Sequence, residues 1–182
     1  MKKNLILSLF ALVALCLGQQ AQAQVGPSVS TAPVTVNIDL QAAVLSIALD
    51  AAPTVNFVYG TAAEYTASKT VTKPGHLTVI SNKPYDLAVS ADGLFTSSNS
   101  TNTTNLPALG IVGITVDAAT LHGGTLTPVT ALTQVDQVLV SGAVAEINAA
   151  YNVNYTITNP SSLISLPLEV YTTTVTYTAT QL

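Results

Sequence analysis

The chain has very little cysteine and no tryptophan or arginine. Its single cysteine, Cys16, lies in an apolar stretch near the N-terminus, and no thiol follows it. Beyond that stretch the sequence therefore excludes a disulfide framework, a zinc site made of cysteines and a cysteine nucleophile. The lack of tryptophan also removes the largest aromatic ring that a sugar-binding surface could offer.

Charged residues are scarce as well, at 8% of the chain. From residue 24 onward three lysines stand against nine acidic residues, which leaves a net charge of −6. Neutralising phosphates requires a basic patch, so we expect no nucleic-acid partner, and anionic membrane surfaces are disfavoured for the same reason. The remaining surface is neutral and rich in hydroxyl groups, which suits packing against other copies of the chain.

The first 23 residues have the three-part pattern of a secretory signal peptide. Two lysines follow the first methionine, residues 5–17 are apolar, and a small-residue cleavage site ends at Ala23. The apolar part is too short to span a membrane. We therefore expect removal of residues 1–23, passage through the periplasm, and a secreted protein at the outer cell surface or in the medium, without membrane insertion. Lipid attachment at Cys16 is the alternative, disfavoured because the preceding Leu15 is not small.

Alternation of apolar and polar residues with a period of two recurs along the rest of the chain, and helical periodicity is nearly absent. The most regular case is VTVNIDL at 34–40. Other alternating or β-branched segments are 43–49, 55–59, 77–80, 85–91, 111–116, 138–140, 151–157 and 171–179. The pattern predicts one all-β domain over residues 34–182, an immunoglobulin-like antiparallel β-sandwich with Greek-key connections. A closed β-barrel is the alternative.

The joins between these segments carry turn and loop signals. Pro74-Gly75 and Gly123-Gly124 predict turns, and residues 61–67 predict a single helical turn. The polar, low-complexity segment 96–105 predicts a mobile loop, and residues 120–133 predict a second irregular stretch.

Side chains that carry chemistry are few and scattered. The two histidines, His76 and His122, stand beside glycine-containing turn signals, so we expect both to be solvated. No nucleophile-elbow motif is present, the acidic residues are too widely spaced for a calcium loop, and no recognisable frame sets two of them as a glycosidase pair. We therefore expect no enzyme, with no catalytic residue, no metal and no cofactor.

Carbohydrate binding is an alternative that the sequence leaves open. Most of the seven tyrosines lie in alternating segments and are expected in the core or at the sheet flanks, whereas Tyr65 is the one most expected to be exposed. On this alternative the chain would be a monomeric adhesive module at the cell surface. It would bind glycans through the loops 96–105 and 120–133.

The expected mature N-terminus leads directly into the most regular segment. Residues 24–33 are polar and contain prolines, which predicts a flexible lead-in. In residues 34–40 the apolar side chains share one face and are Val34, Val36, Ile38 and Leu40. Such a strand can pair with an open sheet edge of its own domain, or with the edge of a second copy by β-strand addition. These four residues form the candidate donor strand.

The order of the strand patterns also resembles a known group of proteins. VNF at 55–57, Tyr65, LTVISN at 77–82, YDLAV at 85–89 and YTTTVTY at 171–177 carry the likeness. They are similar to secreted pilin-like β-sandwich proteins of Gram-negative bacteria, such as spore-coat-U-type fimbrial domains and WxL-like surface domains. The chain departs from them because it has no cysteine pair and no W-x-L tripeptide, so the resemblance assigns no assembly pathway.

The resemblance implies an immunoglobulin-like sandwich at the cell surface that serves as a filament subunit. Composition and the donor-strand pattern favour the same role. We therefore expect a non-enzymatic structural subunit of an extracellular or cell-surface filament, assembled by β-strand addition. Its expected partners are other copies of itself or related surface subunits.

Overall fold

The structure, a computed structural model, describes residues 35–40 and 42–182. The chain divides into two units, Met1–Leu40 and Gln41–Leu182, and every strand of the described residues belongs to the second unit. The expected signal peptide 1–23, the lead-in 24–33 and Val34 lie outside the described residues.

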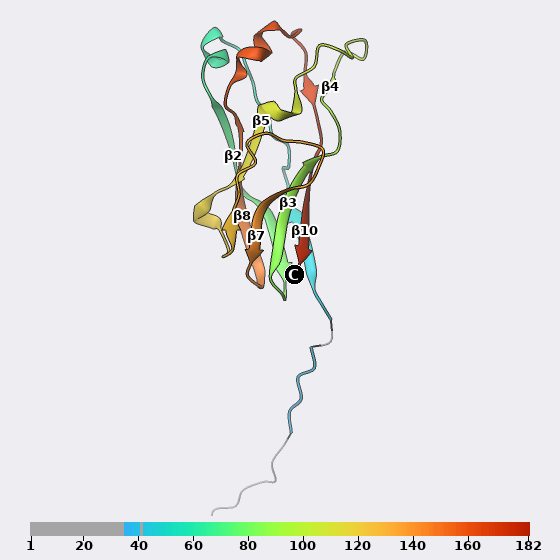
Figure 1. Cartoon of the computed structure of the whole chain (residues 1–182), viewed down its shortest axis with the longest axis vertical. Helices are drawn as coiled ribbons and strands as arrows, with labels where there is room; N and C mark the ends of the chain where they lie inside the picture. Colours follow the sequence, from blue (N-terminus) through green and yellow to red (C-terminus); the bar gives the residue numbers. More distant parts are fainter. Residues whose placement is uncertain (1–34, 41) are drawn as a thin grey trace, which may run out of the picture. The chain divides into compact units, whose positions relative to one another are not determined.

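The second unit is an all-β sandwich, as the alternation predicts (Figure 1). One sheet has the order β1-β2-β8-β5 and the other the order β10-β3-β7-β6, with antiparallel neighbours, while β4 pairs with β9 separately. The strands are β1 (Leu45–Leu49), β2 (Lys69–Ser81), β3 (Tyr85–Ala91), β4 (Thr96–Ser97), β5 (Val112–Val116), β6 (Thr125–Leu126), β7 (Gln137–Ala143), β8 (Glu146–Ile157), β9 (Tyr171–Thr172) and β10 (Val175–Gln181). The short 3₁₀ helices are η1 (Ala62–Tyr65), η2 (Leu109–Ile111), η3 (Ala118–Thr120) and η4 (Pro160–Ser165), and η1 confirms the predicted helical turn.

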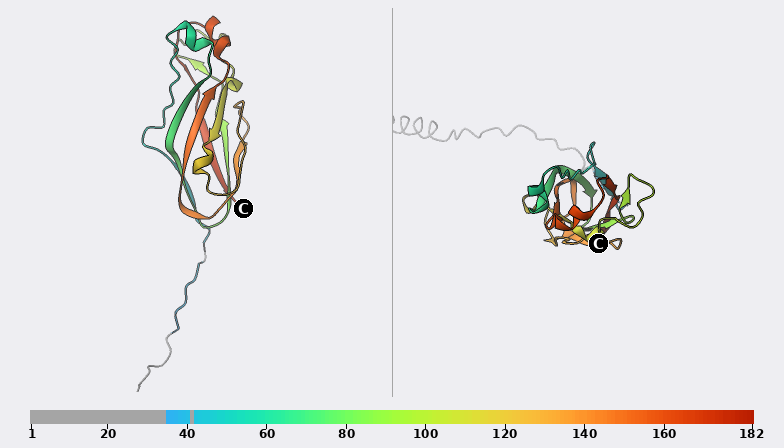
Figure 2. Two further views of the ribbon diagram at one scale, coloured as in Figure 1. Left: turned by 90° about the vertical axis from the view of Figure 1, so that its left-hand side faces the viewer. Right: turned by 90° about the horizontal axis from the view of Figure 1, so that it is seen from above.

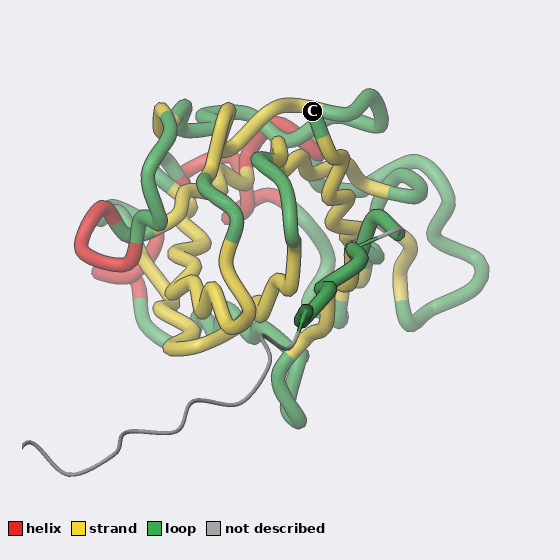
Figure 3. Tube along the Cα trace, turned by 90° about the horizontal axis from the view of Figure 1, so that it is seen from below, coloured by secondary structure: helices red, strands yellow, loops and turns green. Residues whose placement is uncertain are grey.

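The two main sheets face each other (Figures 2 and 3). The core lies between them, and strict alternation of buried and less buried side chains builds it. Every second residue of β3 is buried from Tyr85 to Ala91, and the same holds in β8 from Ala149 to Ile157. Across the core, the Tyr85 hydroxyl lies 2.6 Å from the hydroxyl of Tyr151. A buried hydroxyl requires a hydrogen-bond partner, so this pair joins the two sheets by a polar contact.

Strand β2 is longer than the sequence predicts, because the turn expected at Pro74-Gly75 is a bulge. The register with β8 shifts between Lys73 and Leu77, and Gly75 has a φ of 56°. Glycine adopts this conformation readily and proline interrupts a ladder, so the same two residues suit a bulge as well as a turn. The next residue, His76, is turned into the interior.

Residues 55–59 are extended but form no strand, which corrects the sequence prediction. Every second side chain in the segment packs against the core, so the alternation itself is correct. Lysine side chains hold this segment and the residues just before it in place of a ladder. The Lys73 ammonium donates to the Ala52 carbonyl. The Lys69 ammonium donates to the Val58 carbonyl.

Residues 35–40 form no strand either, although the sequence pattern is the most regular in the chain. The side chains of Val36, Ile38 and Leu40 are 79%, 83% and 88% exposed. Alternation determines which face of a segment is apolar, but a strand exists only where a neighbouring strand completes a ladder. The described part of Met1–Leu40 contains no strand with which 35–40 could form one.

The threonine-rich segment near the C-terminus is two strands instead of one. β9 pairs with β4, whereas β10 pairs with β3 in the main sheet. Between them the Thr173 hydroxyl donates to the Gly93 carbonyl at 2.7 Å. The segment 96–105, expected as a loop throughout, therefore begins with a short strand.

Among the described glycines, Gly124 has the most crowded surroundings. Its φ is +75°, and an added Cβ would lie 2.3 Å from the Ser141 carbonyl oxygen. We expect Gly124→Ala to lower the free energy of unfolding by more than about 3 kcal/mol, because left-handed strain of about 1–2 kcal/mol adds to a clash with the main chain. Denaturant titration measures the change. Gly75→Ala is the matched control, since Gly75 has a φ of +56° but open space around it. Equal losses in the two variants would contradict the steric argument.

Candidate functional site

The two long sides of the sandwich differ in how the gap between the sheets is covered. On one side the segment 125–132 covers the gap between the sheets, because β6 pairs with β7 and the chain then crosses to β5. Val129 exchanges two backbone hydrogen bonds of 2.7 and 2.9 Å with Ile114. Further along β5, the Leu132 N–H donates to the Val112 carbonyl at 2.8 Å. Main-chain pairing therefore closes this side.

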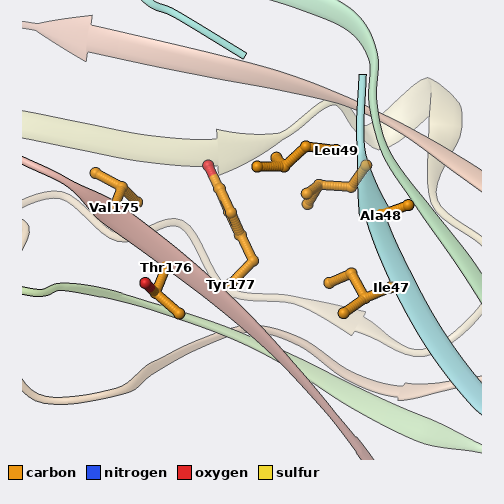
Figure 4. A pocket seen from close by; sticks show the side chains of 7 residues that line it. Ile47, Ala48, Leu49, Val175, Thr176 and Tyr177 are labelled. Atoms are coloured by element: carbon orange, nitrogen blue, oxygen red, sulfur yellow. The ribbon is translucent and has the colours of Figure 1, made fainter. Parts of the chain in front are cut away.

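The opposite side is open. There β1 ends one sheet and β10 ends the other, and neither has a second neighbour among the described strands. A pocket of about 250 Å³ lies between them (Figure 4). Its mostly apolar walls are formed by Ile47, Ala48, Leu49, Leu77, Val175, Thr176 and Tyr177. We call this pocket and the two strand edges beside it the edge groove.

The main chain of β1 faces the edge groove at every second residue. The Asn82 N–H donates to the Val44 carbonyl. The Asp50 N–H donates to the His76 carbonyl. Even-numbered residues thus direct their backbone groups toward β2, and in an antiparallel ladder the residues between them direct theirs the other way. The residues with N–H and C=O groups toward the groove are Leu45, Ile47 and Leu49.

The same reasoning applies to β10. The Asp92 N–H donates to the Thr174 carbonyl, and the Leu182 N–H donates to the Pro84 carbonyl. Even-numbered residues therefore face β3, and the residues that face the groove are Val175, Tyr177 and Ala179. The two edges together present main-chain donors and acceptors beside an apolar pocket, which is the arrangement that accepts an additional strand.

A side chain closes one end of the edge groove. The Gln181 amide nitrogen donates to the Val44 carbonyl at 2.7 Å and to the Ser81 hydroxyl at 3.0 Å. These bonds tie the end of β10 to the residue that precedes β1. The pocket lies further along, beside Val175 at the other end of β10.

A chain of buried polar groups is connected to the edge groove through Tyr177. The hydroxyls of Tyr177 and Tyr155 are 2.6 Å apart, and the Tyr155 hydroxyl lies 2.8 Å from His76 Nε2. His76 is only 1% exposed, and its ring stands edge-on to both tyrosine rings. The expectation that His76 is solvated is therefore wrong, because the bulge at Gly75 turns its side chain inward.

On its other side His76 faces Asp50, the residue that follows β1. The Nδ1 atom of His76 lies 3.3 Å from Asp50 Oδ1 without a hydrogen bond, and Lys73 Nζ lies 3.3 Å from Asp50 Oδ2. Burial lowers the pKa of His76, so its ring is neutral at pH 7. Burial would raise the pKa of Asp50, but the Lys73 ammonium and His76 outweigh this effect and the pKa is lowered. The charges near the ring therefore belong to Asp50 and Lys73.

The second histidine also lies within a network. His122 Nδ1 is 2.7 Å from Glu146 Oε2, and His122 Nε2 is 3.1 Å from the Ala150 carbonyl oxygen. The ring stands edge-on to Tyr151, with centroids 5.0 Å apart. His122 is half-buried, which corrects the expectation of a solvated side chain, and both of its nitrogens are engaged with β8.

The loop 96–105, where a glycan site was considered, is held by its own side chains. Three of them donate to the Glu169 carboxylate, namely Ser97 at 2.5 Å, Asn99 at 3.0 Å and Asn102 at 2.7 Å. These bonds, with that of Asn102 foremost, lower the pKa of Glu169. Tyr65, expected to be exposed, is half-buried with its ring 5.1 Å from that of Tyr59. Three polar side chains of the loop are thus engaged with Glu169, which lies outside it.

Among the described residues, histidine, cysteine, aspartate and glutamate side chains form no group of three or more that could hold a metal ion. The helices of residues 35–40 and 42–182 include none with the length and apolar character needed to cross a membrane. No family model matches the chain, and no curated protein matches it in sequence.

None of the candidate donor residues that the structure describes lines the edge groove. Of the candidate donor residues, Val34 lies outside the described residues, and Val36, Ile38 and Leu40 belong to the unit Met1–Leu40. The groove depends on which strands end each sheet, and that order is not encoded in any local pattern. The only sequence signal for the groove was the regular alternation of β1 and of β10. That alternation predicts two strands, but it does not predict that they end their sheets side by side.

The buried histidine makes stability depend on pH. Because the pKa of His76 is lower in the folded chain than its usual value of 6.5, the unfolded chain binds more protons as the pH falls. We therefore expect the free energy of unfolding to decrease progressively below about pH 6.5. Denaturant titrations at a series of pH values between 7.5 and 5 measure it. His76→Gln should flatten this slope, and an unchanged slope in that variant would disprove the assignment to His76.

Proposed function

We propose that the chain is a non-enzymatic structural subunit of an extracellular or cell-surface filament. Subunits join when a strand from one copy is added at the edge groove of the next. The observation that carries this proposal is the open side of the sandwich, where β1 and β10 border an apolar pocket while the opposite side is closed by the chain itself. The resemblance of the strand patterns to pilin-like proteins supports the same role.

The proposed donor is the segment 34–40, with Val34, Val36, Ile38 and Leu40 directed into the groove. Its seven residues match the seven residues of β10. The exposed side chains of Val36, Ile38 and Leu40 are aliphatic, as the apolar walls of the groove require. The partner is a second copy of the chain or a related surface subunit with an equivalent segment.

The topology favours one orientation of the added strand. β2 and β3 are joined by only three residues, 82–84, so β3 runs back along β2. Since β1 is antiparallel to β2 and β10 is antiparallel to β3, β1 and β10 run in opposite directions. A strand between them must be parallel to one and antiparallel to the other. The antiparallel ladder is the more stable per residue, so we assign it to β10, the longer of the two edges.

Side chains and main chain must both contribute to this contact. Full burial of an aliphatic side chain contributes about 1.5–3 kcal/mol. Association costs an estimated 4–15 kcal/mol in lost translational and rotational freedom, so a few side chains at most balance that cost. Net hydrogen bonds of about 1 kcal/mol each along the ladder must supply the remainder. The contact is therefore sensitive to the loss of a single apolar residue.

The alternation of the donor segment provides a test with a matched control. Ile38→Asp should weaken self-association of the chain beginning at Gln24 at least about 100-fold, because a carboxylate would be buried without a partner in an apolar groove. Asn37→Asp adds the same charge on the other face and should weaken it less than about fivefold. Sedimentation velocity measures both, and electron microscopy shows whether filaments form. Equal effects of the two substitutions would refute the donor assignment.

Engineered cysteines distinguish a contact between copies from one within a copy. No cysteine follows Cys16, so a chain beginning at Gln24 with Ile38→Cys and Ile47→Cys contains only the introduced pair. Mild oxidation should give a ladder of disulfide-linked oligomers on a non-reducing gel. Asn37→Cys with Ile47→Cys, the control, should give far fewer. A disulfide-bonded monomer as the main product would show that the segment pairs with its own sandwich.

A further inference from the structure

The buried polar chain connects both walls of the edge groove. It begins at Asp50, directly after β1, and passes His76 of β2 and Tyr155 of β8 before it ends at Tyr177 of β10. Tyr177 also lines the pocket, and in the view of Figure 4 its hydroxyl end lies toward Val175 and Leu49. A change at His76 can therefore reach the pocket through two hydroxyl groups.

The direction of the hydrogen bonds follows from the charges around the ring. Four groups other than the ring take part or lie near it: Asp50, Lys73, Tyr155 and Tyr177. The Asp50 carboxylate faces Nδ1, so the neutral ring carries its proton there and Nε2 accepts from the Tyr155 hydroxyl. Tyr155 then accepts from Tyr177, whose single hydroxyl proton is directed inward.

Protonation of His76 reverses this order. Both ring nitrogens of an imidazolium are donors, so Nε2 donates to the Tyr155 oxygen. Tyr155 must then donate to the Tyr177 oxygen, which leaves the Tyr177 hydroxyl proton to find another acceptor. The proton that His76 gains comes from solvent, and both tyrosines keep their own protons after rotation of their O–H bonds. An unsatisfied hydroxyl at a largely buried position is unfavourable, whereas a main-chain carbonyl in the groove satisfies it.

We infer that the edge groove is a proton-linked acceptor, in which protonation of His76 frees the Tyr177 hydroxyl to bind a main-chain carbonyl of the added strand. This inference rests on the proposed addition of a strand at the groove and specifies its regulation. Assembly is then stronger in mild acid than at neutral pH. By linkage the added strand also raises the affinity of His76 for its proton by the same factor.

The test compares self-association of the chain beginning at Gln24 at pH 7.5 and pH 5.0, for the wild type and for Tyr177→Phe, by sedimentation velocity. We expect the wild-type association constant to rise about tenfold between these two pH values. Tyr177→Phe keeps the ring in the pocket but removes the hydroxyl, so its association constant should change less than about twofold. Loss of net negative charge in acid affects both proteins alike, because the substitution changes no charge.

A second measurement separates the effect of the Tyr177 hydroxyl on assembly from the effect of His76 on stability. Tyr177→Phe retains His76, so the stability of this variant should keep its dependence on pH while its assembly loses it. If Tyr177→Phe assembles with the same tenfold rise as the wild type, the role of the Tyr177 hydroxyl is refuted. Strand addition at the edge groove is not affected by that result. If the wild type does not self-associate at either pH, strand addition between copies is refuted and this inference falls with it.

Discussion

The constraint on which this molecule depends is that the main chain at the edge of a sheet needs a hydrogen-bonding neighbour. The sandwich meets it on one side with its own segment 125–132, which crosses from β7 to β5. On the other side β1 and β10 form no ladder with each other and border an apolar pocket. Both proposals about function follow from this asymmetry.

The sheets are joined across the core by tyrosine hydroxyls. Tyr85 pairs with Tyr151, and Tyr155 pairs with Tyr177, each at 2.6 Å between one sheet and the other. A chain with a single cysteine, and so without an internal disulfide, thus uses polar contacts that no reductant can break. The second pair also ends at the edge groove, so a contact that stabilises the core lies within reach of a bound partner.

Much of the fold could be predicted because alternation in β3 and β8 determines which side chains point inward. The same signal failed at 35–40 and 55–59, which alternate as well but have no ladder. Alternation shows which side of a segment is apolar, but it does not show whether another strand lies beside that segment. Burial of His76 was missed since Pro74-Gly75 suits a turn and a bulge equally. The edge groove could not be found at all from the sequence, because it is created by strand order, a property of the whole chain.

The amide of Gln181 gives the edge groove a blind end. A segment paired antiparallel along the whole of β10 has its N-terminal end at this residue, so the chain that precedes it must turn away from the sandwich there. The pocket lies at the other end of β10, beside Val175, so we expect an added strand to bind and dissociate from that end, residue by residue along β10. A competing segment can then replace a bound one stepwise. It forms each hydrogen bond as the bound segment breaks it, so the groove is never fully empty during the exchange.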